Sequence, residues 1–189
     1  PGLLSVALDE GKVLSAHQIL KWHYKAMLWP VHRLDRETSG VMMFALTKEA
    51  QAGLKKQFEK HSIKREYYAL VEGKLDSQEG TWQSFLQENS SDYRMKSAPS
   101  GQKAITHYKV VSDNGSISLV LFTLETGRKN QIRVQAAEAG HPIVGDFKYG
   151  SRIRRFKRMC LHAASLGFIH PLSQKELFFR SPLPACFYT

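Results

Sequence analysis

The sequence is poor in cysteine and contains no long apolar run. Its 189 residues include two cysteines, Cys160 and Cys186, which lie far apart and have no further ligands at metal-binding spacing. This pattern argues against a disulfide framework and a zinc site, and it fits a reducing compartment. No apolar stretch approaches the length that spans a bilayer, and no charged-then-apolar signal segment opens the chain. We therefore expect a soluble cytoplasmic protein without metal or membrane.

Acidic residues are scarce relative to basic ones. The chain has 17 Asp and Glu against 27 Lys and Arg, a formal net charge of +10 and a pI near 9.7. Such an excess favours a polyanionic partner, of which nucleic acid is the commonest. A metal-dependent nuclease is disfavoured, because the sequence shows neither a carboxylate cluster nor histidines at paired ligand spacing.

The apolar patterns predict one domain, residues 1–189, that mixes helices and strands. Ser15 and Gln18 form a capping-box pattern ahead of a helix over residues 15–29, which Pro30 ends. The other expected elements are a buried strand over 41–46, a helix that begins at Thr47, strands over 65–72, 101–111 and 117–124, a helix over 128–139 and a short strand over 178–180. Asn114-Gly115 is a strong hairpin signal, and residues 87–100 are polar enough for a mobile loop. The pattern favours an α+β domain on a mixed, largely antiparallel sheet.

Residues 32–40, His-Arg-Leu-Asp-Arg-Glu-Thr-Ser-Gly, place one carboxylate between two guanidinium groups. Arg33 and Arg36 favour the ionised form of Asp35, and the segment from Thr38 onward can turn the chain and offer hydroxyl and amide donors to a phosphate or ribose. The alternative is an exposed loop with a weak surface salt bridge.

Four further segments raise the weight of this motif. They are residues 65–73 (Arg-Glu-Tyr-Tyr-Ala-Leu-Val-Glu-Gly), 126–135 (Thr-Gly-Arg-Lys-Asn-Gln-Ile-Arg-Val-Gln), 140–146 (Gly-His-Pro-Ile-Val-Gly-Asp) and 161–163 (Leu-His-Ala). Together with residues 32–40 they resemble, in order, the motifs of the RluA-like family of RNA pseudouridine synthases. Any one motif is a weak signal, but their order over nearly the whole chain is a strong one.

The resemblance implies a pseudouridine synthase fold, in which a long, bent mixed sheet is flanked by helices and carries a central cleft. It implies isomerisation of uridine to pseudouridine in ribosomal or transfer RNA, by a single chain that needs no cofactor or metal. The target base must be extruded from the RNA stack. Pro1-Gly2-Leu3 resembles the end of an element that follows an opening strand, so we expect residues upstream of this numbering, and no accessory RNA-binding domain precedes the catalytic domain within it.

The resemblance also assigns catalytic residues. Asp35 matches the catalytic carboxylate, which is suited to attack the ribose or to stabilise positive charge on it. Arg133 matches the arginine that pairs with that carboxylate and orients it, although a surface arginine is the alternative. Tyr67 matches the family tyrosine, whose ring can stack on uracil and whose phenol can assist proton removal from carbon 5. Tyr68 should point to the opposite face of the strand.

Other residues are expected to hold the RNA. Arg36 resembles a residue that braces the gap left by the extruded base, Arg33 can bind a flanking phosphate, and His32 is expected to position rather than to act as a base. The full set of expected RNA or substrate contacts is His32, Arg33, Arg36, Thr38, Arg128, Asn130, Gln131, Arg152 and Arg155.

Two positions depart from the family form. Asn130 and Gln135 stand where relatives of the family have histidines. Both amides keep hydrogen-bonding capacity but lose the ability to carry charge near neutral pH. The change therefore bears on substrate binding more than on catalysis.

The segment over residues 148–158 is strongly basic. Six of its eleven residues are Lys or Arg, interleaved with Tyr149 and Phe156, a composition typical of an RNA-contacting edge. A solvated charged loop is the alternative. For the whole chain, the competing hypothesis is a non-catalytic RNA-binding or RNA-folding module that retains the fold, against which the intact Asp35, Tyr67 and Arg133 argue.

Overall fold

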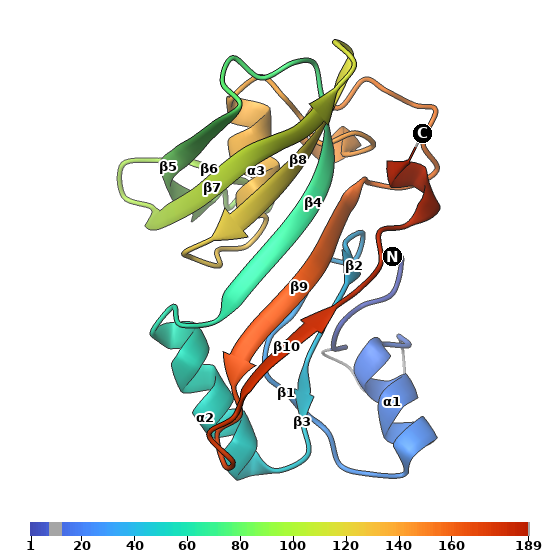
Figure 1. The fold of residues 1–189 in the computed structure, drawn as a ribbon, viewed down its shortest axis with the longest axis vertical. Coiled ribbons are helices and arrows are strands. Elements are labelled where there is room, and N and C mark those ends of the chain that lie inside the picture. Colours follow the sequence, from blue (N-terminus) through green and yellow to red (C-terminus); the bar gives the residue numbers. More distant parts are fainter. Residues whose placement is uncertain (8–12, 189) are drawn as a thin grey trace.

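The computed structural model describes residues 1–7 and 13–188, which fold around one long, mostly antiparallel sheet (Figure 1). Its strands, in spatial order, are β10 (Glu176–Arg180), β9 (Leu161–Ile169), β4 (Lys64–Glu72), β8 (Ile117–Leu124), β7 (Gln102–Asp113), β5 (Glu79–Glu88) and β6 (Met95–Ser97). The short β2 (Ser39–Gly40) joins β9 in parallel, and β1 (Trp29–Pro30) pairs with β3 (Phe44–Ala45) in a separate ribbon. The predicted fold class is confirmed.

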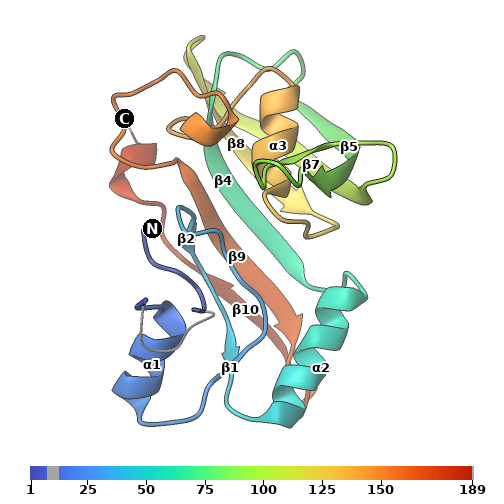
Figure 2. The ribbon, with the colours of Figure 1, turned by 180° about the vertical axis from the view of Figure 1, so that it is seen from behind.

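Helices cover opposite ends of the sheet. The α1 helix spans Ala16–Tyr24 and α2 spans Lys48–Glu59, and both lie at the lower end in Figures 1 and 2. The α3 helix, Gln131–Glu138, packs at the upper end against β5, β6 and β7, as the view from behind shows (Figure 2). Two short 3-10 turns, η1 (Phe147–Tyr149) and η2 (Ala185–Phe187), complete the described elements.

The strand β4 connects the two ends because it pairs with β8 on one side and β9 on the other. Its register against β9 shifts between Glu66 and Tyr67, where a bulge interrupts the ladder. Bulges bend a strand and re-aim its side chains. The register shift lies beside Tyr67, the residue that the family motif singles out.

Each end of the sheet has its own apolar core. Under α3, the fully buried Val120 and Phe122 of β8 pack with Ile132 of the helix. Under α2, Leu54 of the helix packs with Leu166 of β9. Such burial supplies most of the driving force for folding. The segment between the two cores is where the polar motif residues collect.

Several sequence predictions need correction at their boundaries. The helix over 15–29 has the expected Ser15 capping box but ends at Tyr24, because Lys25 adopts a left-handed conformation with φ 49°. The helix over 128–139 begins only at Gln131, because Asn130 is also left-handed. The last strand is longer than 178–180 and spans Glu176–Arg180.

Other predictions were wrong in kind. The buried strand over 41–46 is reduced to Phe44–Ala45, because the chain there leaves β9 and crosses to the β1 ribbon. The polar stretch 87–100 is not one loop, since β5 extends to Glu88 and β6 pairs with it. The strands β5 and β9 were not predicted at all. The strand over 65–72 and the hairpin around Asn114 are confirmed, with the Asn114 Oδ1 accepting from the backbone of Ser116 and Ile117.

Candidate active site

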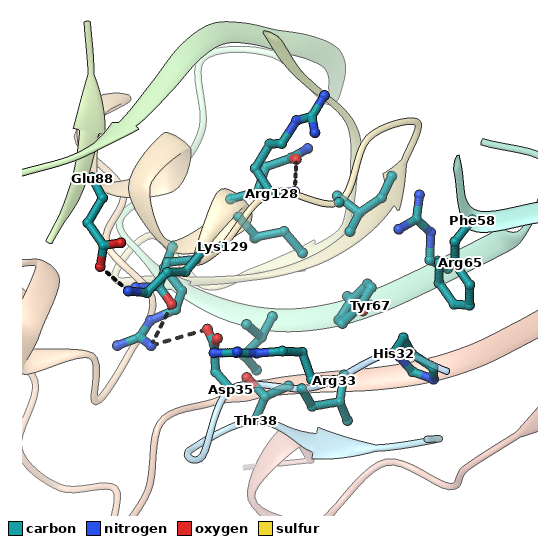
Figure 3. A pocket seen from close by; sticks show the side chains of 18 residues that line it. His32, Arg33, Asp35, Thr38, Phe58, Arg65, Tyr67, Glu88, Arg128 and Lys129 are labelled. Atoms are coloured by element: carbon teal, nitrogen blue, oxygen red, sulfur yellow. Dashed lines mark hydrogen bonds and ion pairs between the residues drawn. The ribbon is translucent and has the colours of Figure 1, made fainter. Parts of the chain in front are cut away.

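The motif residues from distant parts of the chain line one cavity of about 520 Å³ (Figure 3). The loop over 32–40, strand β4 and the start of α3 supply most of its wall. Of the predicted site residues, those that line it are His32, Arg33, Asp35, Thr38, Tyr67, Arg128, Asn130, Gln131 and Arg133. All three predicted catalytic residues therefore share one cavity, whose volume lies within the range of small-ligand sites.

Arg133 pairs with the Asp35 carboxylate, as predicted. Its Nη1 lies 3.2 Å from Asp35 Oδ2, and the arginine is only 5% exposed. Burial lowers the pKa of Arg133, but the hydrogen bonds and charge of Asp146, with those of Asp35, raise it above its ordinary value overall. The guanidinium therefore stays charged at any physiological pH, and a surface arginine is excluded.

Asp146 holds this arginine in place. Arg133 Nε donates to its Oδ2 at 2.7 Å and Nη2 donates to its Oδ1 at 2.8 Å, so the pair is bidentate. Asp146 is 2% exposed, and a bidentate pair fixes the guanidinium plane. The sequence analysis placed Asp146 in a motif but assigned it no role. The carboxylate at the end of the motif over 140–146 was the available signal.

The loop that carries Asp35 is tied to the sheet. The Arg158 Nη2 donates to Ser39 Oγ at 2.7 Å and to the carbonyl of Leu161 at 3.1 Å. Gly40 adopts φ 121°, and a Cβ there would overlap the backbone of Ala163 on β9. Glycine is therefore required where the motif meets the strand. Arg158, counted above with the basic segment, is part of this support.

Tyr67 projects into the cavity from β4, beside the register shift against β9 (Figure 3). Burial raises the pKa of its phenol, the charge of Arg65 lowers it and the charge of Asp35 raises it, with a net increase. The phenol is therefore protonated at neutral pH. Tyr67 packs against the α3 core and Tyr68 against a different cluster on the opposite face, which confirms the predicted alternation.

His32 lines the same cavity and is held by contacts within the protein. Its Nε2 accepts from the backbone N–H of Met43 at 3.0 Å, and its ring stacks on Phe58 with centroids 5.0 Å apart. Burial, and then the charge of Arg65, lower the pKa of His32 to about 4. The neutral ring accepts a backbone hydrogen bond, which fits the predicted positioning role.

Arg65 is a cavity residue that the sequence analysis missed. It is 7% exposed, its Nη2 donates to the carbonyl of Glu125 at 3.1 Å, and its guanidinium lies 5.5 Å from the Phe58 ring centroid. Its Nε is buried without a hydrogen-bond partner among the described residues. Burial lowers the pKa of Arg65 and the nearby Tyr67 raises it, with a net decrease. Its position two residues before Tyr67 was the signal in the sequence.

The side-chain amides of Gln131 and Gln135 make hydrogen bonds within the fold. Gln131 donates to the carbonyl of Ile105 at 3.0 Å and accepts from Thr126 Oγ1 at 2.8 Å. An RNA contact by Gln131 stays a prediction. Gln135 does not line this cavity, and it accepts from Thr106 Oγ1 at 2.6 Å.

Three predicted RNA contacts lie outside this cavity. Arg36 lines a neighbouring hollow of about 890 Å³ that shares Asp35 with the first, and its Nε donates to the carbonyl of Gly2 at 3.0 Å. Arg152 and Arg155 line neither hollow and are exposed, and the Arg155 guanidinium lies 5.1 Å from the Phe156 ring centroid.

Arg128, inside the cavity wall, donates from Nε to the carbonyl of Lys103 at 3.0 Å.

Within residues 1–7 and 13–188, no group of three His, Cys, Asp or Glu side chains is arranged to hold a metal ion. None of the described helices is long and apolar enough to cross a membrane.

Comparison with known proteins identifies the family. The model of the RNA pseudouridylate synthase family matches residues 4–138. The chain is 37% identical over 97% of its length to "Uncharacterized RNA pseudouridine synthase YhcT" of Bacillus subtilis, and 39% identical over 82% of its length to "Ribosomal large subunit pseudouridine synthase D" of Zymomonas mobilis. It covers 64% and 52% of these two relatives.

Solved structures agree. Human RNA Pseudouridylate Synthase Domain Containing 4 superposes with a TM-score of 0.82 at 25% identity, covering 99% of this chain and 84% of that one. Human RNA Pseudouridylate Synthase Domain Containing 1 gives 0.80 at 28% identity, covering 90% and 74%. The chain therefore belongs to the RNA pseudouridine synthase family, in the RluA-like group that its motifs predicted.

Proposed function

We propose that this chain is an RNA pseudouridine synthase that isomerises uridine in RNA. The observation that carries the proposal is the Asp35 carboxylate, 22% exposed and held 3.2 Å from the buried guanidinium of Arg133 at the wall of the cavity that contains Tyr67. A surface loop or a passive RNA-binding face does not require an oriented carboxylate inside a cavity. This arrangement argues against the non-catalytic module.

The carboxylate supplies the first chemical step. Breaking the bond between uracil N1 and ribose C1′ leaves positive charge on the sugar, which Asp35 either captures by nucleophilic attack or stabilises electrostatically. The base then turns and bonds through its carbon 5 to C1′. Loss of the proton from carbon 5 and protonation of N1 complete an isomerisation that needs no co-reactant.

Tyr67 acts on the base. Because burial keeps its phenol protonated, the group is a poor base by itself and is better suited to donate a hydrogen bond while its ring stacks on uracil. A role in removing the proton at carbon 5 requires a second acceptor in the cavity. The stacking role has no such requirement.

The partner in this proposal is RNA. The net charge of +10 favours a polyanion, and a base inside folded RNA must be extruded to reach a cavity of this kind. Arg33 and Arg36 lie at the rim, where a cation can bind phosphate or fill the gap left by the extruded base. The relatives named for the large ribosomal subunit make ribosomal RNA the first candidate, with transfer RNA second. Action as a monomer and in the cytoplasm stay predictions.

The test is to map pseudouridine in total RNA from cells with and without the gene, and then to restore the lost sites in vitro with the purified chain. We expect at least one uridine that is modified only when the gene is present. Identical maps, together with no conversion of unmodified cellular RNA by the purified protein, would refute the proposal and favour the RNA-binding module.

A further inference from the structure

Asn130 lies beside the Asp35 carboxylate, the catalytic group of the proposed function. It precedes α3, is 8% exposed and lines both hollows beside Asp35. Its backbone is left-handed, with φ 53° and ψ 23°, a conformation that asparagine tolerates better than most residues. This conformation aims a short side chain back towards the loop over 32–40.

The hydrogen bonds around Asn130 fix the direction of its amide. The Tyr149 hydroxyl accepts from the backbone N–H of Met95 at 3.1 Å, so its own proton is free to donate to the Asn130 oxygen at 2.9 Å. The Asn130 nitrogen then donates to Asp35 Oδ2 at 2.7 Å and to Oδ1 at 3.1 Å.

The opposite orientation of the amide is unfavourable. In that orientation the amide nitrogen donates to the Tyr149 hydroxyl at 2.9 Å and the amide oxygen gains a 3.4 Å contact with Arg133 Nη1, but that oxygen is set against the carboxylate of Asp35. Two acceptors face each other in that arrangement, and no hydrogen bond joins them.

The charges around Asp35 show why this neutral contact matters. Arg133 shares its single positive charge among the bidentate Asp146, Asp35 at 3.2 Å and Glu37 at 3.7 Å. The contact with Asp35 is longer than either bond to Asp146, so Arg133 is oriented mainly by its other partner. Of Asn130 and Arg133, Asn130 makes the shorter hydrogen bond to the Asp35 carboxylate.

We propose that Asn130 is a positioning residue for catalysis, which fixes the Asp35 carboxylate through a hydrogen-bond chain that runs from the backbone of Met95 through Tyr149. The inference rests on the proposed function, because it assigns Asn130 to the same reaction. It changes the expected role of Asn130 from an RNA contact to a group that acts through Asp35. Because the Asn130 amide is uncharged, this hydrogen-bond chain holds the Asp35 carboxylate without adding a titrating group beside it.

The charged and titratable groups that face Asp35 come from four parts of the fold. They are Arg33, Arg36 and Glu37 on its own loop, Tyr67 on β4, Lys129 and Arg133 at α3, and Asp146 with Lys148 after it. The cavity histidine, His32, has its pKa lowered to about 4 and carries no charge between pH 6 and 8. A histidine placed at 130 would therefore be the only imidazole of this set to titrate near Asp35.

The principal variant is Asn130→Gly, because glycine keeps the left-handed backbone without strain. We expect kcat on a defined target RNA to fall by about 10- to 100-fold, the effect expected of a misplaced catalytic group, with KM and RNA affinity within about threefold of wild type. Asn89→Gly, an asparagine outside both hollows, is the matched control and should leave kcat unchanged. A thermal melt confirms folding.

Two further measurements separate positioning from a structural role. Tyr149→Phe should lower kcat less than Asn130→Gly, and the double variant should be no slower than Asn130→Gly, since both act on one chain. Asn130→His should recover the activity that Asn130→Gly loses, and the ratio of its kcat to that of wild type should change between pH 5.5 and 8, with a midpoint of about 6.5.

Other results would overturn the inference. They are a kcat for Asn130→Gly within twofold of wild type, a loss confined to KM, additive effects of the two substitutions, or a pH-independent ratio for Asn130→His. These results presuppose a wild-type chain that forms pseudouridine. Failure of the wild type on all cellular RNA would instead refute the proposed function, so the two failures are distinguishable.

Discussion

The two ends of the cavity differ in how their charges are satisfied. At one end, Arg133 binds Asp146 and Asp35, and the polar atoms are matched within the protein. At the other end, Arg65 is just as buried but leaves its Nε without a partner among the described residues, beside the neutral His32 and the aromatic Tyr67. A buried unsatisfied donor is costly unless a ligand completes it. One end thus holds the Asp35 carboxylate in place, and in the proposed function the other end binds the base.

The sharpest way to break this comparison is at Asp35 itself. Asp35→Asn preserves size and removes charge, so we expect pseudouridine formation to fall by at least about 1000-fold, as for loss of a nucleophile. RNA affinity should stay within a few fold of wild type, because the carboxylate contributes no favourable contact to phosphate. Tritium release from RNA labelled at carbon 5 of uracil measures the first quantity and filter binding the second. Appreciable turnover by this variant would remove Asp35 from its role.

Arg133 should show the next largest effect. Arg133→Ala leaves Asp146 buried without its partner, and breaking a buried ion pair costs roughly 3–5 kcal/mol of stability. Activity should fall by roughly 100-fold or more through the lost orientation of Asp35. Arg133→Lys keeps the charge but not the bidentate geometry, and it should recover stability more than kcat. Chemical denaturation and single-turnover rates separate the two. Full activity in Arg133→Lys would show that charge alone suffices.

Tyr67 sharpens the contrast at the base-binding end. Tyr67→Phe keeps the ring and deletes the hydroxyl. If the phenol takes part in removing the proton at carbon 5, this variant should bind RNA nearly normally and slow only the steps after the glycosidic bond breaks. Tyr67→Leu should also lose binding of the flipped base, since stacking is worth about 1–3 kcal/mol per base. With 5-fluorouridine at the target, wild type should stop at a rearranged product, and Tyr67→Phe should form it at a comparable rate. Full activity of Tyr67→Phe on ordinary uridine would leave stacking as the only role.

Sequence reasoning singled out the candidate catalytic residues because they lie in short motifs whose letters carry the chemistry. Asp35, Tyr67 and Arg133 are named by their neighbours along the chain, and the cavity brings them together as expected. Asp146 and Arg65 escaped because their roles depend on tertiary contacts rather than on the residues next to them in the sequence. Nothing local shows that Arg65 is buried beneath Phe58, or that Asp146 lies against a helix residue thirteen positions earlier.

The fold was predictable where local signals are strong. The Asn114 turn and the capping box at Ser15 have sequence signatures, and both are present. The strand β9 has none, because Leu161 to Phe168 are buried on both faces and show no alternation of polar and apolar residues. The prediction of a strand over 41–46 was wrong, because the structure of this stretch depends on pairing in two different sheets. Such pairing is a tertiary property that local sequence does not show.

The neutral histidine at the base-binding end predicts an acid sensitivity. The pKa of His32 is about 4 in the folded protein against 6.5 as its ordinary value, so the unfolded chain binds a proton first as pH falls. Stability should therefore be constant above about pH 6.5 and decline towards pH 4, by up to about 3 kcal/mol. His32→Gln cannot titrate, so its unfolding free energy should lose less over this range. Equal pH dependence of the two proteins in urea denaturation would contradict the assignment.

The smallest effect is expected outside the cavity, on the basic segment over 148–158. Arg155 is exposed and touches only Phe156 among the contacts described, so Arg155→Ala should leave kcat unchanged and weaken RNA binding modestly. If this arginine contacts a phosphate, its removal lowers the slope of log affinity against log salt by about one unit. Arg152→Ala should behave alike. Arg158→Ala is the informative contrast within the same segment, because its guanidinium holds Ser39 and Leu161 beneath the catalytic loop. Arg158→Ala should lower kcat while leaving the salt slope nearly unchanged. A catalytic defect in Arg155→Ala with an unchanged slope would contradict the division of this segment into RNA-facing and loop-supporting residues.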